Sequence, residues 1–170
     1  MSATIRRPGA TARTLRRLSQ ILALLGGLVL VGIALMTVFS VAGRVLLSSP
    51  IQGDVELVQL SCAVGLACFL PYTQWQNANI IVDFFTARAA AGTRSRLDAF
   101  GSLALGLVAL LVCWRTGAGA LAARDNEETS MLMGVPLWIP YALMLPGFLL
   151  TALVSFHLCW LRLTGHDTVE

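Results

Sequence analysis

The ionisable side chains that border the apolar runs of this sequence are its best candidates for specific chemistry. Arg44 closes the first apolar run, and Asp54 and Glu56 open the second. Arg115 interrupts the third run. If each run is a helix, counting along the chain brings these four residues to the same end of the helices. Charge beside an apolar environment is costly unless it is paired. We therefore expect an Arg44–Glu56 or an Arg115–Glu56 salt bridge.

Three roles are open to this charged cluster. It would fasten the helices to one another, dock a partner protein, or hold a transported ion. Transporters place ion and substrate sites near the middle of their spans. The middle of each apolar run here carries no acidic residue, which leaves fastening or docking as the expected role.

Most catalytic arrangements are excluded by the residue inventory. The chain has two histidines, His157 and His166, which are too few for a bundle that binds two haems. Its four cysteines form no C-x-x-C pair, and no serine lies in a nucleophile motif. We expect a protein that is not an enzyme and holds no metal or cofactor, with buried cysteines as apolar fillers and His157 in helix packing.

The composition indicates that most of the chain lies in lipid. Of 170 residues, 56% are hydrophobic and 12% are charged, and the mean hydropathy is +0.76. A soluble domain carries about 25% charged residues. The formal net charge of +3 is too small and too scattered for a nucleic-acid surface.

Four apolar runs predict an all-α integral membrane protein with transmembrane helices near 18–43, 54–75, 97–122 and 137–161. About 20 helical residues cross the hydrocarbon core of a bilayer. The first run is longer than the 7–15 apolar residues typical of a signal peptide, so we expect it to be retained.

Local motifs predict where these helices begin. Asp54 is a candidate N-cap for the second helix. The pattern Ser95-x-x-Asp98 resembles a capping box before the third helix, and Pro136 suits the first turn of the fourth helix.

Arginine placement predicts the orientation. The arginines concentrate in the N-terminal segment and in the loop after the second helix, which favours a cytoplasmic location for both termini. We expect a cytoplasmic basic segment at 1–17, a four-helix transmembrane domain at 18–162 and a cytoplasmic tail at 163–170. The tryptophans and tyrosines fall near predicted helix ends, as in an aromatic belt: Tyr72, Trp75 and Trp160 on the inner side, and Trp114, Trp138 and Tyr141 on the outer side.

The segment near 79–90 is neither a span nor a plain polar linker. On a helix, Ile81, Phe84, Phe85 and Arg88 would share one face, and Asn79 and Asp83 would share another. This pattern favours a short amphipathic helix lying in the inner membrane interface. The alternative is that the second helix continues obliquely beyond the membrane.

Several short elements follow one another in a fixed order across the predicted helices. They are Arg44, Gly53-Asp54-x-Glu56, Gly65, Asn79-Ile80-Ile81-Val82-Asp83, Ser130, Gly134-Val135-Pro136-x-Trp138, Tyr141 and Pro146-Gly147. Over about residues 18–162 the chain resembles the small membrane subunit of tripartite ATP-independent periplasmic (TRAP) transporters, the DctQ-like family. Members commonly have histidine where this chain has Asn79.

The resemblance implies a non-catalytic scaffold subunit in the bacterial inner membrane. Its expected partners are a large membrane subunit, which carries the substrate and sodium sites, and a periplasmic substrate-binding protein. The implied activity is sodium-driven uptake of an organic acid. The alternatives are a subunit of a membrane redox or quinone enzyme, and a small autonomous exporter.

Overall fold

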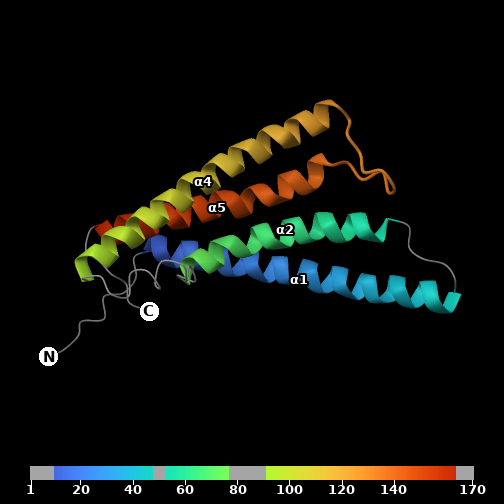
Figure 1. Cartoon of the computed structure of the whole chain (residues 1–170), viewed down its shortest axis with the longest axis horizontal. Helices are drawn as coiled ribbons and strands as arrows, with labels where there is room; N and C mark the ends of the chain where they lie inside the picture. The colour runs from blue at the N-terminus through green and yellow to red at the C-terminus, as the bar shows by residue number, and fades with distance from the viewer. Residues whose placement is uncertain (1–9, 48–52, 77–90, 164–170) are drawn as a thin grey trace.

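The computed structural model describes residues 10–47, 53–76 and 91–163, which form four long helices (Figure 1). They are α1 (Ala10–Leu47), α2 (Asp54–Trp75), α4 (Ala91–Asp125) and α5 (Trp138–Leu163). All four are long and apolar enough to cross a membrane. The predicted all-α class with four spans is confirmed. The segment 79–90, with the proposed interfacial arm, lies outside the described residues.

The four helices pack as a row in the order α1, α2, α5, α4. Helix α4 packs against α5, α5 against α2, and α2 against α1, while α1 and α5 touch only slightly. Figure 1 shows the same order from α1 to α4, with the helices spreading apart toward the end that carries the loop between α4 and α5. The core lies on α5, where Leu150, Val154 and Leu158 are buried together. Helices α1 and α4 therefore form the two edges of the row.

Glycines let neighbouring helices approach closely. A Cβ atom on Gly26 of α1 would lie 2.8 Å from Cβ of Cys68 and 3.0 Å from the carbonyl oxygen of Gly65, both on α2. A Cβ atom on Gly147 of α5 would overlap the carbonyl oxygen of Ala67 on α2. Small residues at helix contacts are typical of packing in membranes, where there is no hydrophobic force between helices.

Two helices are longer than predicted. Helix α1 begins at Ala10 rather than near 18, and α4 begins at Ala91 rather than near 97. The prediction tied each helix to a charge-free run. Arginine is nevertheless a good helix former, and a helix that has been nucleated extends at little cost. The predicted bounds of the second and fourth helices agree with α2 and α5 to within two residues.

The three predicted helix-start motifs were wrong in detail. Gly53, with φ of 81°, occupies the N-cap position of α2, and Asp54 is the first helical residue. The backbone is already helical at Ala91, so Ser95 and Asp98 do not cap α4. Pro136 precedes α5 and pairs with Thr129 in an isolated bridge. Each motif lies within about seven residues of a helix start, but none marks the first helical residue as predicted.

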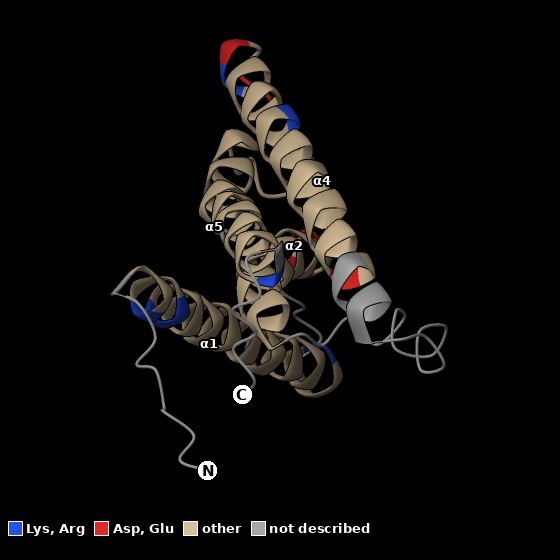
Figure 2. Cartoon of the chain, turned by 90° about the vertical axis from the view of Figure 1, so that its left-hand side faces the viewer, with Lys and Arg blue, Asp and Glu red and all other residues tan. Residues whose placement is uncertain are grey.

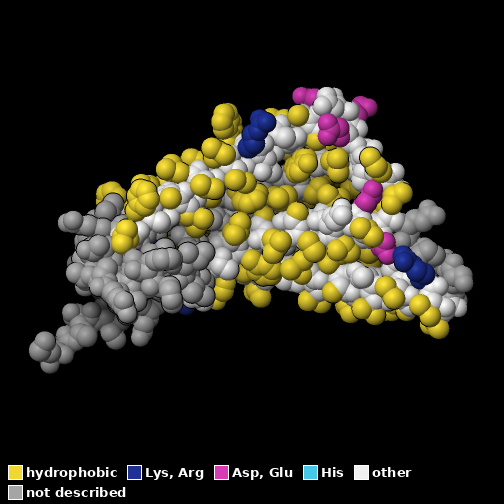
Figure 3. Space-filling model, viewed as in Figure 1, with side chains coloured by type: hydrophobic (Ala, Val, Ile, Leu, Met, Phe, Trp, Pro, Cys, Tyr) yellow, Lys and Arg dark blue, Asp and Glu magenta, His cyan; other side chains and the backbone are white. Residues whose placement is uncertain are grey.

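The surface of the described helices is mainly apolar. In the most apolar part of α1 only 6% of residues are buried, against 44% in α5. Figure 3 shows hydrophobic side chains over the helices and acidic ones gathered at one end, where α1 leads to α2 and α4 to α5. Outside the membrane such a surface would aggregate, so the exposed faces belong against lipid or a partner.

Candidate functional site

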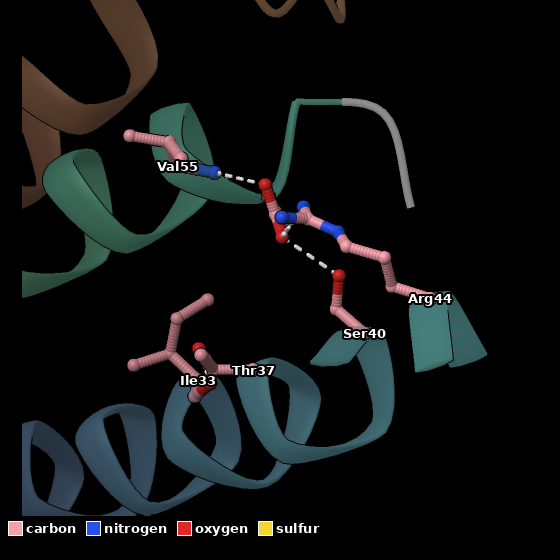
Figure 4. A network of polar contacts seen from close by, with 6 residues as sticks. Ile33, Thr37, Ser40, Arg44 and Val55 are labelled. Carbon is pink, nitrogen blue, oxygen red and sulfur yellow. Dashed lines mark hydrogen bonds and ion pairs between the residues drawn. The ribbon is translucent and has the colours of Figure 1, made fainter. Parts of the chain in front are cut away.

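Asp54 joins the end of α1 to the start of α2 through three contacts (Figure 4). The hydroxyl of Ser40 donates a hydrogen bond to Oδ2 of Asp54 at 2.7 Å, and Nη2 of Arg44 lies 3.6 Å from the same oxygen. The backbone N–H of Val55 donates to Oδ1 at 2.8 Å. Ser40 and Arg44 are four residues apart, so they share one face of α1. The carboxylate is also favoured by the N-terminal end of the α2 dipole.

Glu56 connects α2 to the loop between α4 and α5. Its carboxylate accepts the backbone N–H of Leu132 at 3.1 Å and that of Met133 at 3.4 Å. Ser130 precedes these residues in the same loop, and its hydroxyl accepts the backbone N–H of Val135 at 3.3 Å. Neither predicted salt bridge of Glu56 is present in the described part of the chain. Charge spacing in the sequence predicts pairing of Glu56 with an arginine, whereas the loop supplies backbone amides that bind its carboxylate.

The loop from Asn126 to Leu137 is built to present those amides. Its two arms are joined by the N–H of Ser130 to the carbonyl of Val135 at 2.9 Å, and by the N–H of Leu137 to the carbonyl of Glu128 at 3.0 Å. Gly134 turns the chain with φ of 64°. A folded loop presents several N–H groups in one direction, so one carboxylate can accept from all of them.

Gly53 lets the start of α2 lie directly against the loop between α4 and α5. A Cβ atom at Gly53 would overlap the side chain of Met133 and would lie 3.5 Å from Cβ of Leu132. Its φ of 81° is also a conformation that other residues rarely adopt. We call the set formed by Ser40, Arg44, Gly53, Asp54, Glu56 and 130–133 the junction.

Arg115 is not part of the junction. It is exposed on α4, the edge helix that makes no contact with α1 or α2 among the described residues. Helical counting gave its depth along the helix but not its lateral position in the row. A different arginine of α4 interacts near this end, because the guanidinium of Arg124 lies 5.9 Å from the ring centre of Trp138.

Tyr72, Trp75, Trp138, Tyr141 and Trp160 lie within three residues of a described helix end, whereas Trp114 lies in the interior of α4, eleven residues before Asp125. Several of these aromatic side chains also contact other residues of the chain. Trp75 stacks on His157 of α5, with ring centres 6.3 Å apart, so His157 does take part in packing between helices. The hydroxyl of Tyr72 accepts a hydrogen bond from Gln76. Trp114 and Trp160 are well exposed, and Trp138 and Tyr141 are partly exposed.

Two functional contacts were missed by the sequence argument. Ser40 is 1% exposed and bonds to Asp54. At the opposite end, Arg162 donates hydrogen bonds to the carbonyl of Asp98 at 2.6 Å and to the hydroxyl of Ser102, which fastens α5 to α4. The spacing of Ser40 and Arg44 was the available signal for the first, and no sequence signal points to the second.

The junction holds α1, α2 and the loop between α4 and α5 together. Its carboxylates are occupied by hydroxyl, guanidinium and amide donors of the same chain. Among residues 10–47, 53–76 and 91–163, no group of three or more His, Cys, Asp or Glu side chains could hold a metal ion. The four cysteines are free thiols, of which Cys68 and Cys159 are buried.

Half of the elements on which the family resemblance rests meet at the junction. Arg44, Gly53-Asp54-x-Glu56 and Ser130 are in it, and Gly134-Val135-Pro136 shapes its loop. No curated protein and no solved structure matches the chain. The family model described as tripartite ATP-independent periplasmic transporters, DctQ component, matches residues 33–165. The chain therefore belongs to the DctQ family, a multi-pass membrane component of TRAP transporters rather than a catalytic enzyme.

Proposed function

We propose that the chain is the small scaffold subunit of a sodium-driven transporter that imports an organic acid across the bacterial inner membrane. The membership in the DctQ family supports a transporter component that works with a large membrane subunit and a periplasmic binding protein. In this proposal the large subunit carries the substrate and sodium sites, and the binding protein delivers the substrate. The small subunit holds the immobile part of the carrier in the membrane.

The row of helices is the observation that carries the scaffold role. Because the helices form a single row, broad apolar faces are not covered by other helices of the chain. Of the four described helices, α1 has the smallest buried share in its most apolar part. The junction adds rigidity, because Asp54 fastens α2 to α1 and Glu56 fastens α2 to the loop before α5. A rigid, apolar plate suits a static support for a moving subunit better than it suits a carrier.

The proposed topology has both termini in the cytoplasm. The described start of α1 and end of α5 lie at one end of the row, away from the junction (Figure 1). In the proposed topology the junction would then lie on the periplasmic side, where it would face the binding protein. The bias of arginines toward the terminal side supports this orientation.

Reconstitution tests the proposal directly. The chain, its large subunit and the binding protein would be placed in vesicles with an inward sodium gradient, and uptake of labelled carboxylates would be measured. We expect uptake only when all three proteins and the gradient are present. Uptake by the chain alone would instead indicate an autonomous transporter. Uptake that is unchanged without the sodium gradient, or without the chain, would contradict the driving force or the scaffold role respectively.

A further inference from the structure

The N-terminal part of α1 carries a positively charged face that the transporter scaffold does not account for. Arg13, Arg16 and Arg17 are all exposed, and their spacing of three and four residues puts them on one side of the helix. The buried side of α1 adjoins this face, since Ala12 is 7% exposed and Ser19 is fully buried, and these two lie four and three residues from Arg16. Figure 2 shows this stretch as a basic patch on α1 with no acidic residue on the same helix.

The helix places these arginines at the depth of lipid headgroups. The charge-free run of α1 begins at residue 18 and ends at 43, which corresponds to about 39 Å of helix. A hydrocarbon core is about 30 Å thick and the headgroup layers add about 5–7 Å on each side. Arg17 therefore lies at the edge of the apolar layer, and Arg13 lies about 6 Å further out.

The surface below the arginines is apolar and continuous with them. Ile21, Leu24 and Leu28 follow Arg17 on the same stripe of α1, and they are 52%, 75% and 70% exposed. A charged head above an apolar stripe matches an amphiphile and not a soluble anion or a nucleic acid. An arginine guanidinium also binds phosphate oxygens through two parallel hydrogen bonds.

We propose that Arg13, Arg16 and Arg17 form a binding site for the headgroup of an anionic phospholipid, whose acyl chains lie along Ile21, Leu24 and Leu28. The site goes beyond the proposed function and does not depend on transport. In the proposed topology it belongs to the cytoplasmic leaflet. It would anchor the otherwise exposed edge helix of the row. Other arginines at helix ends, such as Arg162, are committed to partners within the protein.

Native mass spectrometry of the purified full-length chain in detergent tests the site without reference to orientation or uptake. The protein would be titrated with phosphatidylglycerol or with phosphatidylcholine. The variants would be Arg13→Gln/Arg16→Gln/Arg17→Gln, which removes the charge, and Arg13→Lys/Arg16→Lys/Arg17→Lys, which keeps it. We expect wild type to retain phosphatidylglycerol in preference to phosphatidylcholine. The glutamine variant should lose at least about tenfold in phosphatidylglycerol affinity, since each basic residue near an anionic surface contributes on the order of fivefold.

The two variants and a soluble competitor distinguish a lipid site from a small-anion site and from nonspecific adhesion of lipid. The lysine variant should keep most of the affinity, because charge is retained although the forked geometry is lost. Equal retention of the two lipids, or equal loss in the lysine and glutamine variants, would overturn the proposal. Displacement of bound phosphatidylglycerol by excess glycerol phosphate, which has the headgroup chemistry but no acyl chains, would show a site for small anions and would overturn the lipid assignment.

Discussion

At the scale of single residues, the junction depends on which donors a carboxylate finds. Asp54 is satisfied by a hydroxyl, a guanidinium and one amide, and Glu56 by backbone amides of a distant loop. Charge spacing in the sequence predicted the cluster but not its pairing. Backbone amides leave no mark in a sequence, so a carboxylate bound to a loop cannot be distinguished there from one bound to arginine.

Replacing Glu56 tests the contact between α2 and the loop. Glu56→Ala leaves the exposed loop amides of Leu132 and Met133 without the charged acceptor that joins them to α2, and hydrogen bonds to a charged acceptor are stronger than those between neutral groups. We expect the midpoint of thermal unfolding in detergent to fall by several degrees. Glu56→Gln keeps one acceptor oxygen, and its midpoint should fall less. Equal midpoints for wild type and Glu56→Ala would mean that the loop does not depend on this residue.

Gly53 gives a second test at this scale. Gly53→Ala introduces a Cβ that overlaps Met133 in a left-handed conformation, which alone costs about 1–2 kcal/mol. We expect lower thermal stability in detergent, with partial recovery in Gly53→Ala/Met133→Ala because the overlap is removed but the backbone strain stays. Gly32→Ala is the matched control, since a Cβ there meets nothing within 4 Å. Similar losses in Gly53→Ala and Gly32→Ala would exclude a specific role for the turn.

At the scale of elements, glycines determine how closely neighbouring helices approach one another. Gly147 lies against the backbone of Ala67, and Gly26 against Gly65 and Cys68. These contacts set the order α1, α2, α5, because a side chain at either glycine would push the neighbouring helix away.

Gly147→Ala should therefore separate α5 from α2. The new Cβ meets a backbone carbonyl, which cannot move aside as a side chain can, and overpacking of this kind costs about 1–3 kcal/mol. We expect lower thermal stability and a lower yield of the complex with the large subunit, both measured after purification in detergent. Gly119→Ala on α4, where a Cβ has open space, should behave like wild type. A stable Gly147→Ala protein would show that the two helices are held mainly by other contacts.

The elements themselves were largely predictable from the sequence. Apolar runs of sufficient length define the four helices, because a lipid-exposed backbone must satisfy its own hydrogen bonds. The extensions at Ala10 and Ala91 were not predicted, since charged residues were read as the ends of helices. The lateral order was also not predictable. Hydropathy gives depth in the membrane, whereas the neighbours of Arg115 depend on glycine contacts elsewhere.

At the scale of the whole molecule, the two ends of the row differ in chemistry. The junction end combines acidic and basic side chains that are fastened to one another. The other end exposes Arg13, Arg16 and Arg17 on α1. An asymmetric plate of this kind has one preferred orientation in a membrane, because positively charged residues are retained on the cytoplasmic side. The orientation is therefore a property of the entire row and not of one loop.

Cysteine labelling in cells tests that orientation. The experiment uses a variant in which the four native cysteines, Cys62, Cys68, Cys113 and Cys159, are replaced. In that variant, Thr11→Cys places an exposed thiol at one end of the row, and Glu127→Cys places one at the other end. A membrane-impermeant maleimide should label Glu127→Cys in cells with a permeabilised outer membrane, and Thr11→Cys only after lysis. The reverse pattern would invert the topology and place the junction in the cytoplasm. Labelling of both thiols from outside would instead contradict the four-span arrangement, because the three helices between Thr11 and Glu127 must leave them on opposite sides of the membrane.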